Sequence, residues 1–205
     1  MFDYLFSQYA DYDIYHVYLE IIAVIFGILS VWFARKNNIL VFPIGLVSNI
    51  IFIYLLWKWT LLGDMIINGY YVIMGIYGWY HWTRKKDSTV EFPISTTTKP
   101  ERKWSWIIFF TSMAFVIFVY LYFGKLNSIT AYVDTLTTGI FFVGMWLMAK
   151  RKIENWILWI IGDFISIPLY FYKGYTFTSI QYIIFTIIAF YGYLEWKKIL
   201  QQKNN

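Results

Sequence analysis

The sequence contains no cysteine and only two histidines, His16 and His81. Without cysteine the chain forms no disulfide, carries no thiolate nucleophile and offers no sulfur ligand to a metal. Both histidines fall near the ends of apolar runs, which leaves little from which to build a metal site. The sequence also lacks a Ser/His/Asp set, a glycine-rich nucleotide-binding loop and an ATPase motif. We therefore expect no catalytic residue, no metal and no cofactor.

Charged residues are scarce. They make up 14% of the chain, whereas 60% of the residues are hydrophobic. A soluble protein of this size needs far more polar surface, so this balance is typical of an integral membrane protein that contacts lipid. The net charge of +5 comes mostly from short loops and gives no indication of a nucleic-acid partner.

The apolar residues gather in seven runs, each long enough to cross a bilayer as a helix. The runs are continuous instead of alternating, which favours helices over a β-barrel. We predict an all-α membrane protein whose transmembrane helices lie at 17–34, 39–57, 65–82, 104–123, 132–149, 156–172 and 178–196.

The basic residues predict the orientation. If the N-terminus lies outside the cell, 3 of the 17 lysines and arginines also fall outside, namely Lys58, Lys125 and Lys173. Because basic loops stay in the cytoplasm, this asymmetry predicts a periplasmic N-terminus and a cytoplasmic C-terminus.

A repeat in aromatic and basic residues divides the chain. The segment Tyr77-Gly78-Trp79-Tyr80-His81-Trp82 returns as Tyr191-Gly192-Tyr193-Leu194-Glu195-Trp196. Arg35-Lys36 is matched here to Arg151-Lys152, and Gly45 to Gly162, at offsets of 114 to 117 residues. We predict a 3+1+3 arrangement: a three-helix bundle over residues 1–83, a cytoplasmic loop and linker helix over 84–130, and a second three-helix bundle over 131–205. Both bundles then begin outside, so the copies are parallel, and a binding site between two copies is typical of transporters.

Ionisable residues inside membrane spans indicate function, because they are costly there. Asp163 lies well inside the sixth run, on one helical stripe with Trp156 and Trp159. Indoles stack on flat rings and attract cations, and a carboxylate offsets positive charge. The stripe therefore suits a cationic ring. The alternative is a structural aspartate bonded to a neighbouring helix, beside two packing tryptophans.

The first copy has a different stripe on its second helix. There Ile39, Phe42 and Leu46 are aligned to Trp156, Trp159 and Asp163. Asn49 and Phe52 continue it, and an amide near the midplane suits ribose hydroxyls or a carboxamide; an interhelical hydrogen bond is the alternative. Weaker candidates lie in the outer halves of the third and seventh runs: Asn68, Gln181 and Tyr182.

These features resemble a known family. Trp156-Ile-Leu-Trp159-Ile-Ile-Gly-Asp163 is similar to the WxxW signature of PnuC-type vitamin B3 transporters, and the resemblance covers about residues 17–198. It implies a SWEET-like fold and a multi-pass carrier that imports nicotinamide riboside across the bacterial inner membrane by facilitated diffusion. A cytoplasmic riboside kinase would then trap the product. The family's aromatic site maps onto Trp156 and Trp159; the other candidates rest on position and chemistry.

Several alternatives stay open. Related carriers transport thiamine or riboflavin, and thiamine is also a cationic aromatic. A SWEET-like sugar carrier needs less aromatic surface than this stripe offers, and a receptor or scaffold subunit would not transport. The sequence also leaves open whether the protein is a homo-oligomer.

Overall fold

The computed structural model describes residues 13–58, 62–86, 89–90, 92–124, 126, 128–173 and 176–204. Within these ranges the chain forms seven helices: α2 (Ile14–Arg35), α3 (Val41–Lys58), α4 (Leu62–Thr83), α5 (Lys99–Tyr122), α6 (Ile129–Ala149), α7 (Glu154–Tyr172) and α8 (Thr176–Asn204). A small antiparallel hairpin, β1 (Lys85–Lys86) and β2 (Thr89–Val90), follows α4. Each predicted apolar run overlaps one helix, so the all-helical class is confirmed.

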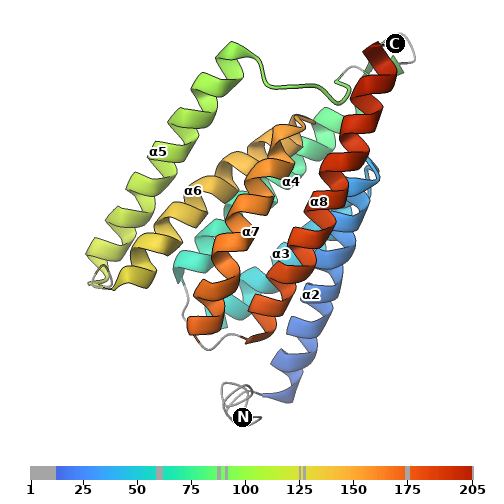
Figure 1. Ribbon diagram of the computed structural model, residues 1–205. Helices are drawn as coiled ribbons and strands as arrows, with labels where there is room; N and C mark the ends of the chain where they lie inside the picture. Colours follow the sequence, from blue (N-terminus) through green and yellow to red (C-terminus); the bar gives the residue numbers. More distant parts are fainter. Residues whose placement is uncertain are drawn as a thin grey trace.

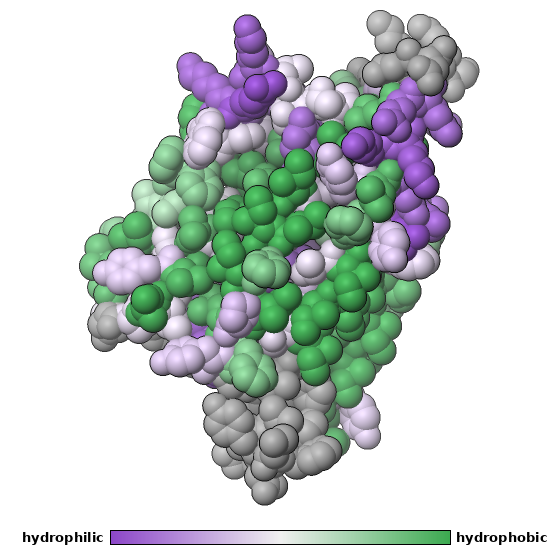
Figure 2. Space-filling view, in the orientation of Figure 1, coloured by the Kyte–Doolittle hydropathy of each residue, from purple (hydrophilic) through white to green (hydrophobic). Residues whose placement is uncertain are grey.

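Four of these helices, α2, α3, α5 and α6, are long and apolar enough to cross a membrane by length and composition. The prediction of seven spans is therefore confirmed as helices, but only four meet that stricter measure. The other three carry the polar and aromatic side chains of the protein's interior, such as Asn68 and Asp163, and α8 continues into a basic segment. Large apolar side chains are exposed along most helices, and Figure 2 shows them covering much of the visible face.

The helices pack in two sets. In one set α2 packs on α3 and α3 on α4; in the other α6 packs on α7 and α7 on α8. Contacts of α2 with α8 and of α4 with α6 join the sets, while α5 packs beside α6 at the outer edge (Figure 1). Most of α6 is buried, which makes it the central helix.

Basic residues gather where α2 and α6 end and where α3 and α7 begin. We call this the basic end of the bundle; it is the upper end in Figure 1. The opposite end holds the start of α6 and the end of α7.

The chain between β2 and α5 binds the turn between α6 and α7. Ser95 N donates to Arg151 O (3.1 Å), and Ile153 N donates to Ser95 O (3.0 Å). Thr98 and Glu101 form a capping box with Pro100 in the first turn, so α5 begins at Lys99, five residues before the predicted run. At the other boundary α8 runs to Asn204, well beyond the predicted end at 196.

Candidate functional site

A cavity of about 1270 Å³ lies between the two helix sets. It exceeds the volume of an ordinary small-molecule pocket, about 300–1,000 Å³. The lining includes all eight residues that the sequence singled out: Asn49, Phe52, Asn68, Trp156, Trp159, Asp163, Gln181 and Tyr182. The structure thus brings these residues to one space, although they come from α3, α4, α7 and α8.

One wall of the cavity is aromatic. The ring of Phe141 on α6 stacks on Trp159, with centroids 5.3 Å apart, and on Tyr182, at 6.0 Å. Tyr71 approaches Trp159 at 6.4 Å, and Tyr170 approaches Tyr182 at 5.2 Å. Offset and tilted rings at these separations attract one another, so the wall is held in shape before a ligand arrives.

Phe141 was missed from the sequence, because nothing in its own run distinguishes it from a packing residue. The residue against which it packs, Gly162, could have indicated it. A Cβ at Gly162 would lie 2.3 Å from Phe141 Cε1, so glycine is required at 162 for the ring to sit against α7.

Asp163 borders this wall in the middle of α7 and is 1% exposed. Neither of its carboxylate oxygens has a hydrogen-bond partner among the described residues. A buried carboxylate without a partner costs several kcal/mol in a membrane interior, roughly the range measured for isolated buried charges. A cation or a hydroxyl donor in the cavity would supply the partner that the described residues do not.

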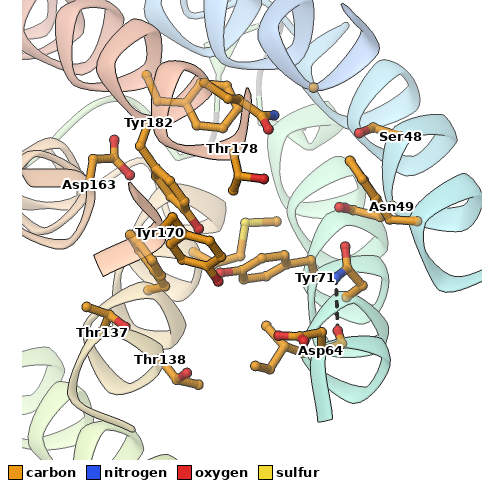
Figure 3. Close-up of a pocket in the computed structure, with 18 of the residues that line it drawn as sticks. Ser48, Asn49, Asp64, Tyr71, Thr137, Thr138, Asp163, Tyr170, Thr178 and Tyr182 are labelled. Carbon is orange, nitrogen blue, oxygen red and sulfur yellow. Dashed lines mark hydrogen bonds between the residues drawn. The ribbon is translucent and has the colours of Figure 1, made fainter. Parts of the chain in front are cut away.

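The facing wall carries amides and small residues. In Figure 3 Asn49 on α3 and Asp163 on α7 lie on opposite sides of the cavity, with Tyr71, Tyr170 and Tyr182 between them. Asn68 Nδ2 donates to Asp64 O (2.9 Å), which leaves its carbonyl oxygen for other donors. Gln181 Nε2 lies 3.7 Å from the place where Gly27 would carry a Cβ.

Trp156 has a different environment from Trp159. It is 1% exposed and packs edge-on against Trp196 at 5.5 Å, just as Phe42 packs edge-on against Trp82 at 5.0 Å. These four rings close the cavity at the basic end, and we call them the aromatic plug. Gly78 and Gly192 make room for it, since a Cβ there would lie 2.3 Å from Phe42 and 2.7 Å from Trp156.

Two hydrogen bonds in the plug mirror each other. Trp82 Nε1 donates to Ala149 O, and Trp196 Nε1 donates to Ala34 O, both at 3.1 Å. The donors are 114 residues apart and the acceptors 115. Just beyond the acceptors, Asn37 and Arg151 take left-handed backbone conformations with φ of 50° and 53°. The two helix ends therefore have the same local geometry.

This geometry corrects the alignment made from the sequence. At a constant offset of 114 residues Arg151 corresponds to Asn37 and not to Arg35. Gly162 then corresponds to Ser48 instead of Gly45, and Asp163 corresponds to Asn49 instead of Leu46. The earlier alignment failed because it matched residue types, whereas packing and backbone conformation decide which positions are equivalent.

The corrected alignment explains why the two walls differ. Gly27 and Gly45 in the first half stand where the second half has Phe141 and Trp159. At these positions a small residue in one half faces a glycine, and a large residue in the other half faces a glycine. In the first half Ser30 packs on Gly45, whereas in the second half Trp159 packs on Gly144. The first half thus offers small and amide groups where the second half offers rings and a carboxylate.

An ion pair lies near the opposite end of the cavity. Lys173 Nζ binds Asp134 Oδ2, both side chains are largely buried, and Tyr120 on α5 donates to the same oxygen (3.4 Å). Lys173 also lies over the Tyr170 ring at 5.1 Å. This pair ties the start of α6 to the end of α7 and borders the aromatic wall.

Long apolar helices around a cavity with aromatic and polar walls define a polytopic membrane protein of the transporter class. Residues 17–198 match the sequence model of the nicotinamide mononucleotide transporter family, and the chain belongs to that family. The resemblance stated from the sequence is confirmed.

Known relatives are similar along most of their length. The nicotinamide riboside transporter PnuC of Haemophilus influenzae is 27% identical over 189 residues, which cover 91% of this chain and 82% of that protein. PnuC of Escherichia coli is 23% identical over 202 residues, with 87% and 84% covered. The riboflavin/roseoflavin transporter RibM of Streptomyces davaonensis is 22% identical over 191 residues, with 90% and 87% covered.

A solved structure has the same fold. The crystal structure of the vitamin B3 transporter PnuC superposes with a TM-score of 0.70 and covers 96% of this chain and 86% of that one. At 24% identity, this likeness establishes the fold.

Proposed function

We propose that this protein carries nicotinamide riboside, a cationic pyridinium joined to a ribose, across the bacterial inner membrane. Transport would be facilitated diffusion, without ATP or an ion gradient. A cytoplasmic riboside kinase would phosphorylate the product and keep it inside. Family membership and the names of the PnuC relatives support this substrate.

The observation that carries the proposal is the unpartnered carboxylate of Asp163 next to an aromatic wall. A pyridinium ring against the aromatic wall, near Trp159 and Tyr182, would give the carboxylate its missing positive charge. The ring would also gain stacking and cation–π attraction, each worth about 0.5–2 kcal/mol. Phe52 would complete the apolar part of this space.

The ribose end of the ligand would face the amide wall. Asn49, Asn68 and Gln181 can both donate and accept hydrogen bonds, as ribose hydroxyls require. Gly27 and Gly45 accommodate the side chains of Ser48 and Ser30, which pack against them, so this wall is built from small residues. A ligand with a ring at one end and a polyol at the other fits two unequal walls.

The bundle organisation belongs to the same proposal. Residues 1–83 and 131–205 form parallel three-helix bundles, and 84–130 supplies the loop and linker helix α5. The mirrored bonds of Trp82 and Trp196 and the packing of α5 on α6 support this 3+1+3 arrangement. The basic end faces the cytoplasm, so the N-terminus is periplasmic and the C-terminus cytoplasmic.

Riboflavin is the second candidate, because RibM is a relative of comparable similarity. Its isoalloxazine ring is uncharged and would leave Asp163 without a counter-charge. Thiamine keeps the positive charge but lacks the ribose, and a simple sugar would leave the aromatic wall unused.

Counterflow tests the proposal. Proteoliposomes preloaded with unlabelled nicotinamide riboside should accumulate the labelled compound without ATP or an ion gradient. Unlabelled thiamine, riboflavin and glucose in the external medium should compete poorly. No accumulation would reject carrier function, and stronger competition by thiamine or riboflavin would reassign the substrate.

A further inference from the structure

We infer that the aromatic plug is the cytoplasmic gate of the carrier, held shut by the two mirrored indole–carbonyl bonds, and that the structure is outward-facing. The inference rests on the orientation given under the proposed function. It concerns how the cavity is closed, whichever ligand the cavity holds.

The first support is the shape of the cavity. At the basic end its lining stops at buried residues, namely Phe42, Met148, Trp156 and Ala189. At the opposite end the lining reaches the last turns of the helices and includes Gly124, Ser128, Lys173 and Thr178. Among the described residues, the cavity and its aromatic wall are therefore open toward the opposite end.

The second support is the tightness of the plug. Phe42, Trp82, Trp156 and Trp196 are all at most 4% exposed, and the Trp82 and Trp196 rings meet at 6.0 Å. No ligand of the size of a nucleoside can pass between rings in such contact, because interiors packed at this density leave few voids larger than a water.

The third support is where the bonds go. The Trp82 bond joins α4 to α6, and the Trp196 bond joins α8 to α2, so each connects the two helix sets and neither lies within one set. Arg35 adds a third tie at the same end through an ion pair with Glu195 (2.7 Å). Arg151, whose pKa burial lowers to about 10, lies over the Trp82 ring at 4.2 Å.

A rigid-body movement of one set against the other at this end therefore breaks both indole bonds together. The acceptors lie in the last turn of α2 and α6, where carbonyls have no i+4 partner within the helix; Ala34 O also accepts from Asn37 N (2.9 Å). Losing one bond should shift the balance toward the open form, and the symmetry predicts nearly the same shift for either bond.

The absence of cysteine allows a direct test. An Ala189→Cys reporter lies behind the plug, where Ala189 is 1% exposed. In inside-out vesicles, a membrane-impermeant maleimide should label it slowly from the cytoplasmic side. Adding Trp82→Phe or Trp196→Phe should raise the labelling rate about fivefold in each case, the change expected from one net hydrogen bond. Trp106→Phe on exposed α5 should leave the rate unchanged.

Unchanged labelling in both plug variants would overturn the inference, as would fast cytoplasmic labelling of the parent reporter. A rise in one variant alone would overturn the symmetric form. If either tryptophan variant is not monodisperse on gel filtration, Glu195→Gln serves in its place, because it weakens the Arg35 tie at the same end; no rise in labelling would again count against the gate.

The labelling requires no substrate, so it separates the two proposals. Normal gating without riboside counterflow would reject the substrate and keep the gate. Riboside counterflow together with a labelling rate that does not change in the plug variants would keep the substrate and reject the gate.

Discussion

Asp163 and Asn49 occupy equivalent positions in the two halves of the protein and lie on opposite sides of one cavity (Figure 3). A repeated unit thus presents a carboxylate on one side and its uncharged amide analogue on the other. The difference of one charge between equivalent positions gives the cavity a direction, and most of our predictions test that direction.

Replacing Asp163 by asparagine should weaken binding of nicotinamide riboside at least tenfold, because the positive ring loses its only proposed counter-charge. Reduced nicotinamide riboside has nearly the same shape without the charge, so we expect it to bind the parent protein more weakly. Its affinity should not decrease further in the variant. Calorimetry on purified protein measures both ligands. Equal losses for the two ligands would contradict an electrostatic role.

Trp159→Ala should also reduce riboside affinity at least tenfold, since it removes a stacked ring worth about 1–2 kcal/mol with its burial. Trp159→Phe should retain part of the affinity. Trp106→Ala is the matched control, because Trp106 is 61% exposed on α5, away from the cavity. Full affinity of a folded Trp159→Ala protein would remove this indole from the site.

Asn49→Ala should weaken riboside binding about fivefold, the effect of one hydrogen bond worth about 1 kcal/mol. 1-Methylnicotinamide, a cationic ring without ribose, should bind the variant and the parent equally. Titrating both ligands into both proteins checks this. A loss for both ligands would show that Asn49 supports the site as a whole and does not contact the ribose.

Gly78→Ala and Gly192→Ala should lower the thermal unfolding temperature, because the new methyl group would meet Phe42 or Trp156 at 2.3–2.7 Å. Gly69→Ala, in the same helix as Gly78, has nothing within 4 Å and should be neutral or slightly stabilising. Thermal unfolding in detergent followed by size exclusion measures all three. Equal stability of the three variants would mean that the plug packs less tightly than described.

Lys173→Met should destabilise the protein by about 1–3 kcal/mol, because Asp134 would keep a largely buried charge without its partner. The double variant Asp134→Asn, Lys173→Met should recover part of this loss. Unfolding temperatures of the two single variants, the double variant and the parent form the double-mutant cycle. Additive losses would show that the pair contributes no coupling energy.

The sequence by itself determined the helical class. Apolar runs of this length have to satisfy their backbone hydrogen bonds internally, so they form helices wherever they lie. It also identified the polar and aromatic residues that stand out against apolar surroundings, such as Trp159, Asp163 and Asn49. All eight candidate residues from the sequence line the cavity, although their contact with substrate stays a prediction.

Only the tertiary structure decided which positions of the two halves correspond and what surrounds each side chain. In a membrane protein the faces toward lipid and toward neighbouring helices are both apolar, so sequence periodicity does not separate them. Phe141 was therefore overlooked, and Trp156 was grouped with Trp159 although it packs in the plug. The contacts of α2 with α8 and of α4 with α6 join residues more than 60 positions apart, as in the bonds of Trp82 and Trp196, and no local pattern encodes them.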